Sequence, residues 1–201
     1  MTRYRLVGFT GRAGAGKDTA ADFVAKAYGF RRYAFADPMK AGLNAMFGWS
    51  PLNWQDRAWK EAPNEALGGF SPRFLAQTLG TEWGRQTVHS NLWVWLAERR
   101  WQQLNAANAT TFGALPCMAI SDVRFANEAH WIKTRGGAVI EVERPDAAPV
   151  AAHASEAGVP RDLVDHVVLN DGGIEDLFDK LRRVLTPPIP MDDPVGPSAY
   201  P

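Results

Sequence analysis

Short apolar stretches alternate along the chain with longer stretches in which apolar residues recur every three or four positions. The apolar stretches predict five strands, over residues 4–9, 32–36, 117–121, 138–142 and 164–169. The longer stretches predict helices over 17–28, from 37 onward, over 72–105 with a break near 90–91, over 128–135 and over 174–185. Strands that alternate with helices indicate a parallel sheet with right-handed crossovers. We therefore predict an α/β fold with a five-stranded parallel sheet flanked by helices.

Three segments fall outside this alternation. Residues 49–69 carry three tryptophans among charges and prolines, which indicates an insertion over a cleft. Residues 145–160 are rich in Ala and Pro and are expected to form a loop. Residues 187–201 contain six prolines without periodicity, so we expect an extended or disordered tail. The folded domain is therefore predicted to occupy residues 1–186.

Composition mainly excludes classes of protein. Hydrophobic residues at 46% and charged residues at 22% are ordinary for a globular domain. Lys and Arg together number 22, as do Asp and Glu, so no net field favours DNA, RNA or anionic lipid as a partner. Cys117 is the single cysteine, which excludes an intramolecular disulfide and fits a reducing compartment. Because no apolar stretch approaches the ~20 residues of a membrane span, we expect a soluble cytoplasmic protein.

A glycine-rich segment follows the first predicted strand and precedes the first predicted helix. Gly11-Arg12-Ala13-Gly14-Ala15-Gly16-Lys17 matches the first seven positions of the P-loop pattern. Such a loop turns its backbone N–H groups toward phosphate oxygens, and the helix adds its positive N-terminal end. Lys17 can then reach the β- and γ-phosphates. A glycine-rich turn without a ligand is the alternative, but the strand and helix on either side favour a cradle for a nucleoside triphosphate, most directly ATP.

The residue after the lysine departs from that pattern. Asp18 stands where Ser or Thr normally contacts Mg²⁺, and Thr19 follows it. Asp18 can bind the ion or its water shell, since Mg²⁺ keeps several waters, or it can be a first-turn carboxylate favoured by the helix dipole. These two interpretations stay open. Thr19 is a candidate donor to the α-phosphate.

Two aspartates end predicted strands. In a doubly wound sheet, ligands bind outside the carboxyl ends of the strands. Asp122 follows the third strand in the arrangement that holds Mg²⁺ in P-loop enzymes. Asp37 ends the second strand and can orient an acceptor phosphate, hold metal-bound water or act as a base. For both, a turn or helix cap is the alternative, and Asp37 before Pro38 suits an N-cap.

Arginines are the expected ligands of the phosphates, because planar guanidinium groups bind such oxygens bidentately. Arg124 lies two residues beyond a strand end and is therefore placed near the crevice. Arg85 lies in a segment of unusually mixed composition, but chemistry alone does not prefer it to Arg73, Arg99 or Arg100.

Four segments resemble a known family when they are taken in order. They are Gly16-Lys17-Asp18-Thr19, Phe35-Ala36-Asp37-Pro38-Met39-Lys40, Leu79-Gly80-Thr81-Glu82-Trp83-Gly84-Arg85 and Ser121-Asp122-Val123-Arg124-Phe125-Ala126-Asn127-Glu128. Together they resemble the deoxynucleoside monophosphate kinases of bacteriophages and prophages. The resemblance implies a P-loop NTPase fold of the nucleotide-kinase type and transfer of the γ-phosphoryl of ATP to a deoxynucleoside 5′-monophosphate, with Mg²⁺. Gly-Lys-Asp-Thr is the usual form in that family.

The resemblance also implies roles for segments and residues. Residues 49–105 become a monophosphate-binding insertion, and 145–160 become a lid in which His153, Ser155 and Glu156 match a His-x-Ser-Glu segment. The residues expected at each site are then as follows: catalytic, Lys17, Asp37 and Arg124; donor nucleotide, Gly11, Ala13, Gly14, Ala15, Gly16, Lys17, Asp18, Thr19 and Asn170; acceptor, Asp37, Lys40, Arg85, Arg124 and Glu156; metal, Asp18 and Asp122.

Other functions remain to be distinguished from a nucleotide kinase. A P-loop kinase of dephospho-coenzyme A or phosphomevalonate differs in its acceptor. A P-loop switch or assembly ATPase hydrolyses ATP without an acceptor and depends on a macromolecule, and a binding module holds ATP without turnover. The sequence leaves open the preferred base, the choice between ribose and deoxyribose, and whether the protein is a homodimer.

Overall fold

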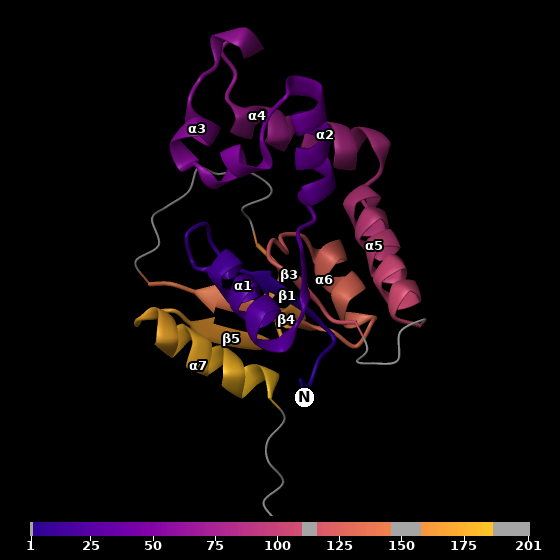
Figure 1. Ribbon diagram of the computed structural model, residues 1–201, viewed down its shortest axis with the longest axis vertical. Coiled ribbons are helices and arrows are strands. Elements are labelled where there is room, and N and C mark those ends of the chain that lie inside the picture. The colour runs from indigo at the N-terminus through magenta and orange to yellow at the C-terminus, as the bar shows by residue number, and fades with distance from the viewer. Residues whose placement is uncertain (1, 110–115, 146–157, 187–201) are drawn as a thin grey trace, which may run out of the picture.

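A parallel sheet lies at the centre of the computed structural model, which describes residues 2–109, 116–145 and 158–186 (Figure 1). Within these ranges the strands are β1 (Leu6–Thr10), β2 (Arg31–Tyr33), β3 (Met118–Ile120), β4 (Ala138–Glu143) and β5 (His166–Leu169). Their order across the sheet is β2-β3-β1-β4-β5, and every neighbouring pair is parallel. The predicted five-stranded parallel sheet is therefore confirmed.

Both faces of the sheet are covered, which explains why the inner strands β1 and β3 are almost entirely apolar. Alternate residues of a strand point to opposite faces. Leu6 and Met118 pack with one buried cluster, toward α5 (Leu92–Ala109) and α6 (Ala126–Lys133). Val7 and Ala119 pack with another, toward α1 (Lys17–Tyr28) and α7 (Ile174–Leu185). The loop between β1 and α1 therefore lies at the carboxyl end of the central strand, between the two helix layers.

The helix α1 has the bounds that local sequence signals predict. The helix runs from Lys17 to Tyr28 and ends at Gly29, which adopts φ 73° and donates its N–H to the Ala25 carbonyl. Gly is favoured at this position because it reaches positive φ without steric cost.

The second strand is shorter than predicted. It ends at Tyr33, and residues 34–36 turn into α2 (Asp37–Phe47), whereas the apolar pattern predicts a strand to residue 36. The backbone N–H groups of Phe35 and Ala36 donate to the Asp122 carboxylate and not to a neighbouring strand. A tertiary contact therefore ends the strand early.

The region between α2 and β3 is helical and irregular. It comprises η1 (Pro51–Gln55), α3 (Arg57–Glu61), η2 (Glu65–Leu67), α4 (Pro72–Gln77), the π-helix η3 (Thr78–Val88) and α5. The predicted break falls at residues 89–91, between η3 and α5. The wide π-helical turns are not predicted. A Cβ at Gly84 in η3 would lie 2.6 Å from the Trp93 ring, so close packing requires glycine there.

The helices α2, α3 and α4 form a layer separate from the sheet and its flanking helices (Figure 1). A short helix, η5 (Arg161–Leu163), precedes β5. None of the helices in the described ranges combines the length and the apolar character that a membrane span needs. Most of the predicted lid and the whole predicted tail lie outside the described residues.

Candidate functional site

The loop between β1 and α1 has a backbone that only glycine allows at two positions. Gly11 has φ 126°, and a Cβ there would lie 2.2 Å from the carbonyl oxygen of Val142 in β4. Gly16 has φ 106°, and a Cβ there would lie 2.7 Å from Nδ2 of Asn170. Left-handed backbone and close approach both exclude a side chain. The loop is thus held against the ends of two neighbouring strands, directly before the N-terminus of α1.

Lys17 extends across this loop. Its Nζ donates to the carbonyl oxygens of Gly11 and Arg12, at 2.8 Å in each case. These contacts place the ammonium group over the cradle at the start of α1, where helix dipole and backbone N–H groups already favour an anion.

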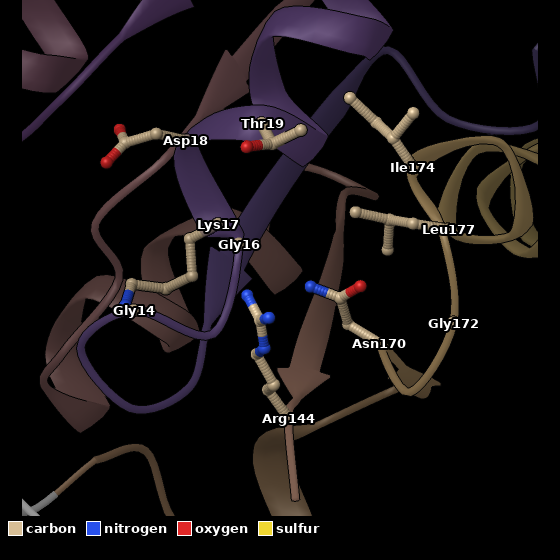
Figure 2. A pocket seen from close by; sticks show the side chains of 10 residues that line it. All are labelled: Gly14, Gly16, Lys17, Asp18, Thr19, Arg144, Asn170, Gly172, Ile174 and Leu177. Atoms are coloured by element: carbon tan, nitrogen blue, oxygen red, sulfur yellow. The ribbon is translucent and has the colours of Figure 1, made fainter. Parts of the chain in front are cut away.

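A cavity of about 460 Å³ opens beside the loop (Figure 2). Its lining comprises Gly14, Gly16, Lys17, Asp18, Thr19, Arg144, Asn170, Gly172, Ile174 and Leu177. The Asn170 amide donates to the Ala15 carbonyl at 2.8 Å and thereby ties the end of β5 to the loop. Ile174 and Leu177 add an apolar wall from α7. We call this the donor cavity, since it joins a phosphate cradle to a partly apolar chamber.

A second cavity of about 640 Å³ adjoins the first and reaches α2, α3, α4 and η3. The two cavities share Gly14, Lys17, Asp18 and Arg144. Cations outnumber acids in the second lining: Lys17, Lys40, Arg57, Lys60, Arg73, Arg85, Arg124 and Arg144 against Asp18, Glu61, Asp122 and Glu128. Such a lining favours an anionic ligand, and we call this chamber the acceptor cavity.

Three of these cations, Arg57, Lys60 and Arg73, come from the α3–α4 region, and the sequence named only Arg73 of them, as an alternative to Arg85. Burial lowers the pKa of Lys60, and the positive charges of Arg73 and Lys40 lower it further. Lys40, which the sequence assigns to the acceptor, lies with its Nζ 5.9 Å from the centre of the Trp54 ring. The acceptor cavity is therefore positively charged at both its P-loop end and its helical end.

Asp122 lies at the carboxyl end of β3, as predicted, and lines the acceptor cavity. Its Oδ1 accepts the Phe35 N–H at 2.7 Å and its Oδ2 accepts the Ala36 N–H at 3.0 Å. Each oxygen thus has one protein donor, and the carboxylate anchors the start of α2 to β3. Its role as a metal ligand stays a prediction.

Asp37 has a local structural role. Its Oδ2 accepts the Ala34 N–H at 2.8 Å, and it is not among the described residues that line either cavity. Burial raises the pKa of its carboxyl, an effect opposed by the Ala34 hydrogen bond and reinforced by the negative charge of Asp122. The turn-forming alternative left open by the sequence is therefore present. The N-cap alternative is wrong, because α2 begins at Asp37 itself and its N-cap is Ala36. Contact of Asp37 with a substrate stays a prediction.

Asp18 projects from the first turn of α1 with 77% of its side chain exposed. It forms an ion pair with Arg32 of β2, which also pairs with Asp22 and donates to Ser121 Oγ at 3.2 Å. Arg32 is therefore a neighbour of the site that sequence reasoning placed only in a strand. Its position depends on the packing of α1 against β2, which no local pattern reveals.

Arg85 and Arg124 come together on one wall of the acceptor cavity, although they are 39 positions apart in the chain. The Arg85 guanidinium stacks 3.9 Å from the centre of the Phe125 ring and pairs with the buried carboxylate of Glu128. The Arg124 N–H donates to the same carboxylate at 2.7 Å. Of the four candidates from the sequence, Arg85 and Arg73 line this cavity, and the contact of Arg85 with the acceptor's phosphate stays a prediction. The sequence places Glu128 in one of the family segments and predicts no role for it.

Arg144 is a further residue that the sequence did not single out. It follows β4, lines both cavities, and directs its guanidinium between the P-loop and Asn170 (Figure 2). The signal that pointed to Asp122, a polar residue directly after a buried strand, is equally present here. Thr19 lines the donor cavity, and its contact with the α-phosphate stays a prediction. His153, Ser155 and Glu156 lie outside the described residues.

Comparisons with known proteins agree on one family. The family model for deoxynucleotide monophosphate kinase matches residues 55–181. A putative deoxynucleotide monophosphate kinase of Acanthamoeba polyphaga mimivirus is 32% identical over 186 residues, covering 88% of this chain and 93% of the relative. The deoxynucleoside-5′-monophosphate kinase of Escherichia phage T5 is 25% identical, covering 82% of this chain and 89% of the relative.

Solved structures align over most of the chain at lower similarity. TT1252 from Thermus thermophilus has a TM-score of 0.46 and 19% identity, and the alignment covers 89% of this chain and 95% of that one. Dephospho-CoA kinase from Campylobacter jejuni has a TM-score of 0.40 and 13% identity, with coverages of 90% and 95%.

Proposed function

The chain belongs to the deoxynucleotide monophosphate kinase family, and from this premise we propose that it transfers the γ-phosphoryl group of ATP to a deoxynucleoside 5′-monophosphate. The products are ADP and a deoxynucleoside diphosphate. One observation carries the proposal: a phosphate-loop cavity and a cation-lined cavity adjoin and share Lys17 and Arg144. A donor and an acceptor bound in these chambers meet at the two shared cations.

The donor cavity suits ATP. The loop N–H groups and the N-terminus of α1 hold the phosphates, and Lys17 offsets charge on the β- and γ-phosphates. Ile174, Leu177 and Asn170 line the same chamber, where an apolar wall and an amide suit the adenine.

The available oxygen ligands fit Mg²⁺, which prefers carboxylates and retains several waters. Asp18 is exposed, lines both cavities and has Arg32 to offset part of its charge. Among the described residues each Asp122 oxygen accepts one backbone N–H, which leaves a lone pair suited to a metal-bound water. We assign these two carboxylates to the ion. When bound, Mg²⁺ supplies charge neutralisation on the phosphates.

The acceptor's phosphate belongs on the wall formed by Arg85 and Arg124, facing the shared cations. A phosphate monoester is mostly a dianion at neutral pH, since its second pKa is about 6. The acceptor therefore needs no strong general base, and transfer depends on in-line positioning and charge neutralisation without a covalent enzyme intermediate. Asp37 is therefore assigned to organising the turn at the start of α2 rather than to proton removal.

Replacing Arg144 tests the meeting point of the two cavities. We expect Arg144→Met to lower kcat by about 100-fold, the usual cost of losing one donor to developing charge, with smaller effects on both KM values. Steady-state kinetics in both substrates measures this split. Arg182→Met is the matched control, because Arg182 pairs with Asp179 on α7 outside both cavities. A kcat within twofold of the wild-type value would show that Arg144 takes no part in the transfer.

An acceptor panel tests the function itself. ATP is supplied with each common deoxyribo- and ribonucleoside monophosphate, with dephospho-coenzyme A and with phosphomevalonate, and ADP formation is followed. We expect turnover with at least one deoxynucleoside monophosphate. Turnover with a non-nucleotide acceptor alone would indicate a kinase of another small metabolite. ATP consumption at the same rate with and without an acceptor would favour a hydrolytic switch.

A further inference from the structure

Glu128 carries a carboxylate that is almost entirely removed from water. The residue is 1% exposed and lies in the first turn of α6, next to Arg85 and Arg124 at the wall of the acceptor cavity. Burying a charge is costly unless the charge is paired and hydrogen-bonded. The position therefore demands partners, and their identity indicates what the carboxylate does.

Three donors from two distant segments converge on this carboxylate. Its Oε1 pairs with Nη2 of Arg85 on η3, while its Oε2 accepts the backbone N–H groups of Arg124 at 2.7 Å and Phe125 at 3.0 Å. The Phe125 ring covers the face of the same guanidinium. Arg85 is thus held at one edge by a carboxylate and on one face by a ring.

Helix capping explains only part of this arrangement. A Glu that accepts the N-cap N–H is a common start to a helix, and a Gln side chain does the same. Capping needs only one side-chain oxygen of Glu128 as an acceptor, and it does not need a negative charge on that side chain. The bond from the other oxygen to Arg85 joins η3 to the start of α6, and this bond is the one that uses the negative charge.

Arg85 keeps donors for a ligand after these contacts. A guanidinium has five N–H groups, and the contacts to Glu128 and to the Ser90 carbonyl engage Nη2 and Nη1. Because the side chain is ordered in the folded protein, its rotamer freedom is lost during folding and not on binding. The same carboxylate also fixes the main chain that carries Arg124.

We propose that Glu128 is the positioning residue of the acceptor site, holding the Arg85 guanidinium and the Arg124 main chain in one prealigned arrangement for the acceptor's phosphate. The proposal rests on the proposed function, since it assigns both arginines to that phosphate. Glu128 acts through the arginines and does not itself touch the substrate.

Glu128→Gln is the primary test, because it keeps the shape and the helix cap while removing the charge that holds Arg85. We expect KM and the calorimetric Kd for the deoxynucleoside monophosphate to rise about tenfold, while KM for ATP stays within twofold. Glu128→Asp, which keeps the charge on a shorter stem, should recover part of the affinity. A purely structural residue would change both KM values together or only the stability.

Glu98→Gln is the matched control. Glu98 on α5 also pairs with an arginine, Arg135, and accepts a hydrogen bond from Trp131 Nε1 at 2.7 Å, but it lines neither cavity. This variant should leave both KM values unchanged. If Glu128→Gln does not fold, Phe125→Leu replaces it: removing the ring while keeping the ion pair should raise the acceptor KM about threefold, again without change for ATP.

A pH series supplies a readout specific to the carboxylate. Burial raises the pKa of Glu128, Arg85 opposes this rise, Asp122 adds to it, and the backbone N–H groups of Arg124 and Phe125 oppose it. Lowering the pH from about 8 to about 6 therefore favours protonation of Glu128, which weakens its hold on Arg85. The acceptor phosphate titrates over the same range, so the wild-type acceptor Kd is divided by that of Glu128→Gln. This ratio should rise toward one as the pH falls.

The outcomes separate the proposal from the function on which it rests. Failure of the wild-type protein to bind or phosphorylate any deoxynucleoside monophosphate would overturn both. Normal wild-type turnover with an unchanged acceptor KM in Glu128→Gln would overturn the positioning role alone. A lower acceptor KM in that variant would also overturn it, because the carboxylate would then only offset positive charge.

Discussion

Lys17→Met should lower kcat by at least about 100-fold while the protein stays folded. The Lys17 ammonium lies across the loop with 2.8 Å contacts to the Gly11 and Arg12 carbonyls, and it lines both cavities (Figure 2). A bound γ-phosphate offers it a charged partner, and negative charge on that group is redistributed during transfer. Methionine keeps most of the aliphatic stem and removes the charge.

The structural cost of this change should be small. The carbonyls that Lys17 contacts lie in a partly exposed loop, so we expect stability to change by no more than about 0.5 kcal/mol. Urea unfolding measures this, and Lys26→Met, an exposed change in the last turn of α1, is the matched control. Near-normal kcat in Lys17→Met would refute the phosphate cradle.

Arg85→Ala should destabilise the protein by about 3–5 kcal/mol, the usual cost of leaving a buried charge without its partner. The partner is Glu128, whose side chain is 2% exposed. The sequence assigns Arg85 to the acceptor and does not reveal the buried carboxylate that pairs with it. A role in substrate binding alone would give this variant a simple rise in the acceptor KM. Loss of the ion pair is therefore expected to obscure any effect on substrate binding.

A double variant separates the two effects. Arg85→Ala with Glu128→Gln removes the uncompensated charge, so urea unfolding should show much of the lost stability restored. The coupling energy from the double-mutant cycle should fall at the upper end of the ~0.5–3 kcal/mol found for contacting residues. Equal unfolding midpoints for Arg85→Ala and the wild type would show that the buried Glu128 side chain does not need the positive charge of Arg85.

Elements with local signals were predictable. The helix α1 has its predicted bounds because a glycine in left-handed backbone precedes it and another ends it. The strands β1 and β3 were predictable because they are buried on both faces and therefore almost entirely apolar. The motifs around Lys17, Asp122 and Arg124 lie at strand ends, where parallel strands bring ligands together.

Elements that depend on tertiary contacts were not predictable. The strand β2 ends early because Asp122, 86 positions beyond Ala36, captures backbone N–H groups there. The π-helix η3 packs so closely on Trp93 that Gly84 admits no side chain. Likewise, Arg32 and Glu128 gain their places from the strand order and from packing between segments.

The most direct test of the account follows the label of [γ-³²P]ATP with and without a deoxynucleoside monophosphate. The account predicts that label leaves ATP in proportion to the monophosphate supplied and appears in the deoxynucleoside diphosphate, with little free phosphate. Label appearing as free phosphate at the same rate in both reactions, with none in a diphosphate, would contradict phosphoryl transfer between the two cavities.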